Sequence, residues 1–185
     1  MFWIYFLIIV LVVIIFSGIV IYHDTHNFVV RKYDIDTDKI DGDMTIVLLS
    51  DLHGYVFGNN NDRLISAIDE IKPDIVLSAG DMFTAHSRDG IVHYEAGLHV
   101  LTSLAKRYPV YAGNGNHEFY IKHFTKDYGN LFDRYRSYLV KAGVVTLENE
   151  SIDIPDKNVE TRLQTPDQMW PRIMKWKTQE FMLYI

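Results

Sequence analysis

The first residues of this chain form an apolar run that strongly limits the folds open to it. Residues 2–22 carry no charged side chain. A helix rises ~1.5 Å per residue, so the run is long enough to cross the ~30 Å hydrocarbon core of a bilayer. Trp3, Tyr5 and Tyr22 lie near its ends, where aromatic side chains favour the membrane interface. The run predicts a single-pass transmembrane anchor over residues 1–22.

A cleaved signal peptide and a buried core helix are the alternative interpretations. No Lys or Arg precedes the run, and residues 19–22 (IVIY) lack the small side chains of a cleavage site. Arg31 and Lys32 follow the run and favour a cytoplasmic body by the positive-inside rule. Acidic residues around this pair weaken that argument, so the sequence leaves the side of the membrane open.

The remainder has the composition of one globular domain. The chain has 185 residues, of which 48% are hydrophobic and 23% charged, and it has no Cys, which excludes disulfides, thiolate metal sites and a Cys nucleophile. Its formal charge of −6 argues against nucleic acid as a partner, because binding rests on neutralising phosphates.

Short apolar runs alternate with helical patterns behind a polar connector at residues 23–43. Buried strands are predicted at residues 45–50, 75–78, 109–112 and 144–147, further strands at 29–35 and 152–154, and helices at 62–71, 93–107 and 131–142. This alternation predicts an α/β fold with a mainly parallel sheet.

Polar side chains gather where the first three buried strands end. The clusters are Ser50-Asp51-Leu52-His53-Gly54, Ala79-Gly80-Asp81-Met82 and Gly113-Asn114-Gly115-Asn116-His117-Glu118. Each cluster alone is typical of an ordinary turn. Sites in parallel sheets form at the carboxyl ends of the strands, so three such clusters in succession predict one shared site.

The residue types suit a pair of divalent metal ions. Asp51 and His53 are two residues apart and would point to the same side of an extended segment, where both can bind one ion. Asp81 has two oxygens with which to bridge two ions, and Asn116 offers an amide oxygen to the second. Oxygen and imidazole ligands suit Mn, Fe or Zn, and paired ions serve phosphoester hydrolysis. His117 is the candidate catalytic residue, donating to the phosphate or protonating the leaving oxygen.

The motifs Asp51-Leu52-His53, Gly80-Asp81 and Gly115-Asn116-His117-Glu118 resemble those of the calcineurin-like metallophosphoesterase family. The resemblance covers residues 44–154 and is greatest to small membrane-associated bacterial members, including the group that cleaves the pyrophosphate of a UDP-linked lipid A precursor. It implies the first part of a four-layered metallophosphoesterase sandwich. It also implies that Asp51 and His53 bind one metal, Asp81 bridges, Asn116 binds the second metal and His117 acts on the phosphate.

The chain departs from this family after the third motif. The family has a later His and a terminal G-H-x-H, whereas no His follows His123 here. Residues 155–185 have five basic and four acidic residues and no strand–helix alternation. They are either an accessory element that docks on the sheet or the membrane, or a departure of the reading frame, which we favour. We therefore expect an anchor followed by roughly the first half of a larger domain.

The sequence predicts a membrane-anchored hydrolase of phosphomonoester, phosphodiester or pyrophosphate bonds, including lipid-linked ones. The alternative is a catalytically dead fragment or an anchored binding module, because the later His ligands are absent. No G-x-x-x-x-G-K-[ST] motif is present, which argues against a phosphate-binding NTPase. Among the other histidines, His86 is near enough to the second motif to line the site, while His23, His26, His93 and His99 have no predicted role.

Overall fold

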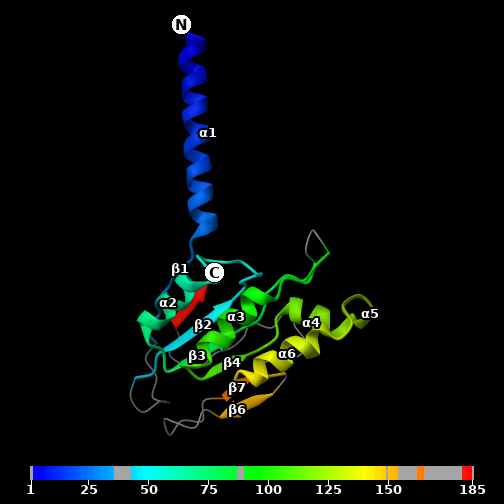
Figure 1. The fold of residues 1–185 in the computed structure, drawn as a ribbon. Helices are drawn as coiled ribbons and strands as arrows, with labels where there is room; N and C mark the ends of the chain where they lie inside the picture. The colour runs from blue at the N-terminus through cyan, green and yellow to red at the C-terminus, as the bar shows by residue number, and fades with distance from the viewer. Residues whose placement is uncertain are drawn as a thin grey trace.

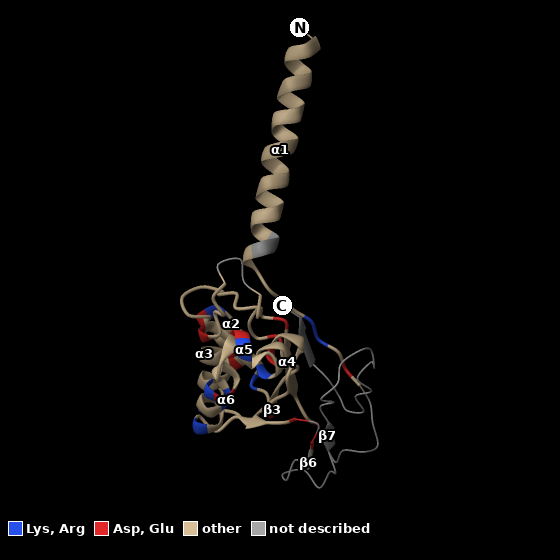
Figure 2. Ribbon diagram, turned by 90° about the vertical axis from the view of Figure 1, so that its right-hand side faces the viewer, with Lys and Arg blue, Asp and Glu red and all other residues tan. Residues whose placement is uncertain are grey.

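A computed structural model of the chain describes residues 2–35, 43–86, 90–148, 150–153, 162–164 and 181–184. Helix α1 (Phe2–His26) is longer than the predicted anchor and projects away from the rest of the molecule (Figure 1). Its large apolar side chains are 38% to 77% exposed. Figure 2 shows no charged residue along residues 2–22. The helix is long and apolar enough to span a membrane.

A six-stranded sheet forms the centre of the body. Its strands, in spatial order, are β1 (Val29–Val30), β8 (Phe181–Tyr184), β2 (Ile46–Ser50), β3 (Ile75–Ser78), β4 (Val110–Ala112) and β5 (Val145–Thr146). Every neighbouring pair is parallel except β1 and β8. The predicted α/β fold with a mainly parallel sheet is therefore confirmed.

Helices cover one face of this sheet (Figure 1). They are α2 (Asp62–Ile71), α3 (Glu95–Leu104), α4 (Asn116–His123) and α6 (Leu131–Lys141). The short helix α5 (Thr125–Tyr128) packs against α4 beyond the sheet. Side chains of a strand alternate between its two faces. Val47 and Leu49 accordingly pack in the cluster that includes α2, α3 and α6, whereas Ile46 and Leu48 pack in a second buried cluster. Burial on both faces explains why these strands read as continuous apolar runs.

The sequence predicted the central elements well and the last ones poorly. Helix α2 has the predicted bounds, whereas α3 is five residues shorter than predicted and α6 is one residue shorter. The strand predicted at residues 152–154 is instead β6 (Ser151–Asp153), which pairs with β7 (Arg162–Gln164) in a separate two-stranded sheet. Helices α4 and α5 and strands β7 and β8 were not predicted. Strand β8, within the segment interpreted as a divergent tail, pairs with β2 over four residues.

Candidate active site

The first cluster forms a tight turn, the β2 turn (residues 50–54), directly after strand β2. Asp51 and His53 have φ values of 60° and 50°, a left-handed conformation that residues with a Cβ rarely adopt. Leu52, between them, is buried in the core, whereas Asp51 and His53 are exposed. The turn therefore presents a carboxylate and an imidazole to solvent at the sheet edge, while its central side chain fixes it to the core.

Backbone hydrogen bonds hold the β2 turn against the second cluster, the β3 turn (residues 79–82). The N–H groups of Asp51, His53 and Gly54 donate to the carbonyl oxygens of Gly80, Asp81 and Met82 at 3.2, 2.9 and 3.0 Å. Asp81 is also left-handed, with φ of 54°. These bonds continue the pairing of β2 with β3 beyond the strands, and they offset the cost of the unusual dihedrals.

The third cluster, the β4 turn (residues 113–118), approaches the β3 turn so closely that a side chain would not fit between them. A Cβ at Gly115 would lie 2.5 Å from both the backbone nitrogen and Oδ1 of Asp81. The backbone N–H of His117 donates to Asp81 Oδ1 at 2.8 Å. The carboxylate of Asp81 is therefore fixed by the first turn of helix α4, and Gly115 is required for steric reasons.

Glu118 joins the β3 and β4 turns from inside the protein. Its side chain is 1% exposed, and its carboxylate accepts hydrogen bonds from the backbone N–H groups of Asp81, Met82 and Gly115 at 2.8, 3.0 and 3.0 Å. Burial raises the pKa of Glu118 to about 7, although the hydrogen bonds from the backbone of Asp81 and Met82 oppose that rise. Sequence reasoning gave Glu118 no role. Its position at the third residue of helix α4, where Glu often completes a cap, was the signal available.

His117 lies beside His53, and a backbone hydrogen bond determines which nitrogen of the His117 ring carries the proton. The N–H of Ala85 donates to His117 Nδ1 at 3.0 Å, so the neutral ring carries its hydrogen on Nε2. Burial lowers the pKa of His117, which favours this neutral form. The rings of His53 and His117 stand edge to face with centroids 5.1 Å apart. His117 thus presents an N–H donor at the edge of the sheet where Asp51 and His53 lie.

Asp51 and His53 have the arrangement expected of two ligands of one cation. His53 Nε2 lies 3.6 Å from Asp51 Oδ1, and both side chains are nearly half exposed. The hydroxyl of Ser50 donates to the other oxygen of Asp51, and Thr84 Oγ1 lies 3.5 Å from His53 Nδ1. Contacts of this kind orient metal ligands from outside the coordination sphere. The donor set of this pair therefore fits a divalent ion.

The remaining predicted ligands are near but are not gathered into one cluster. Asp81 lies in the neighbouring turn, and Asn116 is an exposed residue at the start of helix α4. Within the described ranges, no three His, Cys, Asp or Glu side chains are grouped as they would be around a metal ion. His86 packs edge-on against Tyr120 of α4 with ring centroids 4.9 Å apart.

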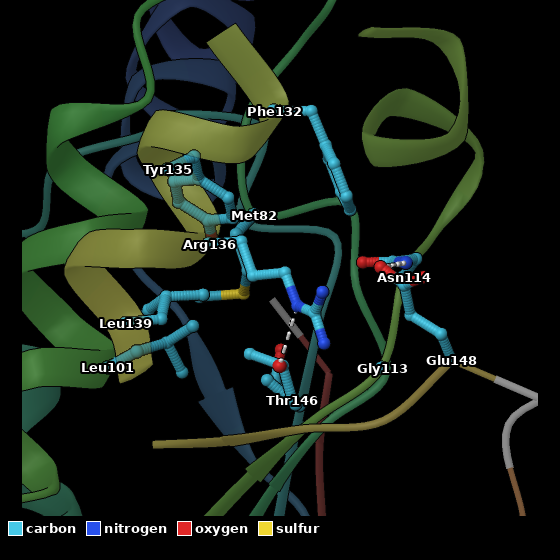
Figure 3. A pocket seen from close by; sticks show the side chains of 12 residues that line it. Met82, Leu101, Gly113, Asn114, Phe132, Tyr135, Arg136, Leu139, Thr146 and Glu148 are labelled. Atoms are coloured by element: carbon cyan, nitrogen blue, oxygen red, sulfur yellow. Dashed lines mark hydrogen bonds between the residues drawn. The ribbon is translucent and has the colours of Figure 1, made fainter. Parts of the chain in front are cut away.

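A hydrogen-bonded network supports the β4 turn from the side of β5. Glu148 accepts from Asn114 Nδ2 at 3.4 Å and from Lys122 Nζ at 2.9 Å, which ties the turn to helix α4. Beside it, Arg136 of α6 donates to Thr146 at 3.1 Å (Figure 3). The side chains of this network other than Lys122 line a cavity of about 10 Å³, which is no larger than one water molecule needs. The cavity therefore belongs to the support of the turn rather than to a substrate site.

An open groove lies on the other side of the β2 turn. Its volume is about 680 Å³, within the range of ligand-binding clefts. Gly54, Val56 and Asn60 line one wall, and residues of the α3 region, including His93 and His99, line the other. Neither histidine had a predicted role, and their place beside the β2 turn depends on how the sheet brings α3 next to it.

Known proteins resemble this chain over its body. The sequence model of the calcineurin-like phosphoesterase family matches residues 44–178. An uncharacterized metallophosphoesterase of Campylobacter jejuni is 29% identical over 113 residues, an alignment that covers 58% of this chain and 29% of the relative. The chain thus spans less than a third of the length of that relative. No solved structure matches the chain.

Proposed function

This chain belongs to the calcineurin-like phosphoesterase family, and we propose that it is a membrane-anchored, metal-dependent phosphoester hydrolase. Membership of the family points to metal-dependent hydrolysis of phosphoesters. The membrane anchor, the pair of metal ions and the roles of individual residues are our proposals. The site assignments rest on the hydrogen bonds that join the β2, β3 and β4 turns, made by the backbone and by Glu118. The anchor rests on the length and apolar character of α1.

We assign Asp51 and His53 to one divalent ion, Asp81 to a bridge between two ions and Asn116 to the second ion. Such ions polarise the phosphoryl oxygens and supply a nucleophile at neutral pH. Buried backbone N–H groups hold the turns, so the ligands need little reorganisation to bind. The 3.6 Å approach of His53 to Asp51 supports the first assignment.

His117 is the proposed catalytic residue. Its Nε2–H is free of the backbone bond that Nδ1 accepts from Ala85, so it can donate to a phosphate oxygen or to the leaving oxygen. The backbone of His117 also holds Asp81 through the bond at 2.8 Å. His117 thereby holds the carboxylate of Asp81 with its backbone and offers its ring N–H to the substrate.

Phosphomonoesters, phosphodiesters and pyrophosphates are the proposed substrates, including lipid-linked ones. The support for lipid-linked substrates is proximity to the bilayer, given an uncleaved α1. Among the described residues, no three His, Cys, Asp or Glu side chains are grouped around one point, which favours a second candidate function, an anchored binding module without turnover. Two metal ions bound per chain would count against this second candidate.

The experiment uses the full chain purified in detergent, with Mn²⁺ and a chromogenic aryl phosphodiester or phosphomonoester. Asp81→Asn keeps an oxygen to accept the His117 N–H but removes the charge, so we expect turnover to fall about 100-fold or more. Asp133→Asn, on the exposed face of α6, is the matched control and should be unaffected. If the unaltered chain shows no metal-stimulated turnover and binds fewer than two metal ions per chain in calorimetry, the binding module is the better description.

A further inference from the structure

The strand register places α1 at the same edge of the sheet as the candidate site. Val29 pairs with Tyr184, and Tyr184 pairs with Ser50, the residue before Asp51. Strand β1 runs antiparallel to β8 and β2, so the chain before Val29 lies beyond the carboxyl ends of the parallel strands. We call the carboxyl ends of the parallel strands, where the β2, β3 and β4 turns lie, the site edge. Helix α1 ends at His26, three residues before Val29, and therefore leaves the body from the site edge (Figure 1).

Contacts at the base of α1 fasten it to the loop that follows the β2 turn and to the start of helix α2. Arg63 donates to Asn27 Oδ1 at 2.8 Å and to the carbonyl oxygen of His26 at 3.4 Å. The ring of Phe28 packs edge-on against Phe57 of that loop at 5.1 Å between centroids. Phe28 is half-buried against the main core, so the position of α1 relative to the site is built into the fold.

Apolar side chains remain exposed on the loops around this base. Tyr55 and Val56 follow the β2 turn and are 36% and 47% exposed, and Ile91, in the loop after β3, is 59% exposed. The two loops adjoin, because a Cβ at Gly54 would lie 3.0 Å from the carbonyl oxygen of His93. We name Tyr55, Val56 and Ile91 the interfacial rim. Single exposed apolar residues are common, but these three are in two adjoining loops, one of which directly follows the β2 turn and contacts the base of a membrane-length helix.

We propose that the interfacial rim rests on the bilayer surface, so that the candidate site faces the lipid headgroups. This inference depends on the anchored state in the proposed function. Two strand spacings separate β1 from β2, which sets the Asp51 turn about 10 Å from the strand that follows the anchor. Amphiphilic phosphoesters, whose phosphate lies at headgroup level while their chains stay in the bilayer, can then reach the site without leaving the membrane.

The first test measures contact with lipid and needs no activity. The chain has no Cys, so Val56→Cys and Ile91→Cys each give one attachment point for an environment-sensitive fluorophore. Val140→Cys, at a residue of α6 that is 54% exposed, is the matched control. In vesicles of phosphatidylcholine and phosphatidylglycerol, we expect blue-shifted emission that doxyl-labelled lipid quenches at the rim but not at residue 140.

Two results would overturn the proposal. One is quenching of the rim labels by aqueous iodide as strongly as the label at residue 140, which would place the rim in water. The other is protection from both quenchers, which would mean that a protein, such as a second copy of the chain, covers the rim.

The second test separates this inference from the proposed function. The variant Ile91→Ser should hydrolyse a phospholipid-like ester in vesicles about twofold more slowly, because interfacial affinity scales with buried apolar area. Its turnover of a water-soluble aryl ester should not change. Equal rates for the variant and the unaltered chain on vesicles would refute the proposed contact between the interfacial rim and the bilayer. If the unaltered chain were inactive on both substrates, the proposed function would be refuted. The fluorescence test would then show by itself whether the interfacial rim contacts the bilayer.

Discussion

Helix α1 and the site edge adjoin each other, but the conformation of the first depends on local sequence and that of the second on contacts between distant residues. The large apolar side chains of α1 are 38% or more exposed, and Arg63 and Tyr55 of the body contact it at its base, through His26. The site edge has three non-glycine residues in the left-handed region, Asp51, His53 and Asp81. Each is held by a partner about thirty residues away in the chain. Local sequence determines the helix, whereas the site edge exists only when distant turns meet.

The strongest test of this difference removes the residue that joins two of those turns. Glu118→Ala would leave three buried N–H groups without an acceptor, each worth about 1–3 kcal/mol. We expect the free energy of unfolding of the body to fall by about 3–5 kcal/mol, measured by near-UV circular dichroism in detergent with increasing urea.

Two further variants make this result interpretable. Glu118→Gln keeps one acceptor oxygen and should lose less stability than Glu118→Ala, so it remains measurable if the Ala variant does not fold. Val12→Ala, in the exposed part of α1, should leave the unfolding of the body unchanged. Equal effects of Val12→Ala and Glu118→Ala would remove the contrast between the two regions.

A smaller loss is expected at the loop between the β2 turn and α2. Asn61 is 0% exposed, and its side chain accepts from Phe57 N at 2.8 Å and donates to the carbonyl oxygen of Tyr55 at 3.3 Å. Asn61→Ala should lower the free energy of unfolding by about 1–3 kcal/mol in the same urea experiment. Asn60→Ala is the matched control, because Asn60 is also left-handed but exposed. Similar losses at both positions would assign the effect to backbone conformation alone.

The pH dependence of stability should report the partly buried ring of His117. Because burial lowers the pKa of His117 in the folded state, the unfolded chain binds a proton more readily. The stability of the unaltered chain should therefore fall relative to His117→Gln as pH decreases below about 6.5, the ordinary histidine value. Urea unfolding at several pH values measures this difference. If the stability of the unaltered chain instead fell relative to His117→Gln as the pH rises, the folded state would favour the charged ring.

The smallest effect is expected at the support of the β4 turn. Lys122 and Glu148 form a partly exposed ion pair at 2.9 Å. Lys122→Met keeps most of the aliphatic stem, so we expect a loss of about 1 kcal/mol or less in the free energy of unfolding. Lys126→Met, at an exposed position of α5, is the control. A loss at Lys122→Met larger than at Asn61→Ala would show that the ion pair holds the turn more firmly than its geometry indicates.

The elements predicted from the sequence are those with a strong local pattern. Strands β2 and β3 are continuous apolar runs between turn residues, and α2 has apolar side chains at helical spacing. Helix α4 begins inside Gly115-Asn116-His117-Glu118, which reads as a turn, so its helical character was hidden by the motif. Strand β8 belongs to the sheet through its pairing with β2, a contact between residues more than 130 positions apart that no local pattern reveals.

The sequence by itself determined the apolar helix, the alternation of strands and helices, and the residue types at the three strand ends. Hydropathy and the spacing of apolar residues are local properties of the sequence, so they can be recognised without knowledge of the tertiary structure. The tertiary structure decided that Asp51, His53 and Asp81 take left-handed dihedrals, that Glu118 joins their turns from within, and that α1 leaves from the same edge. These features depend on hydrogen bonds between distant backbone groups, whose pairing is fixed only when the sheet assembles.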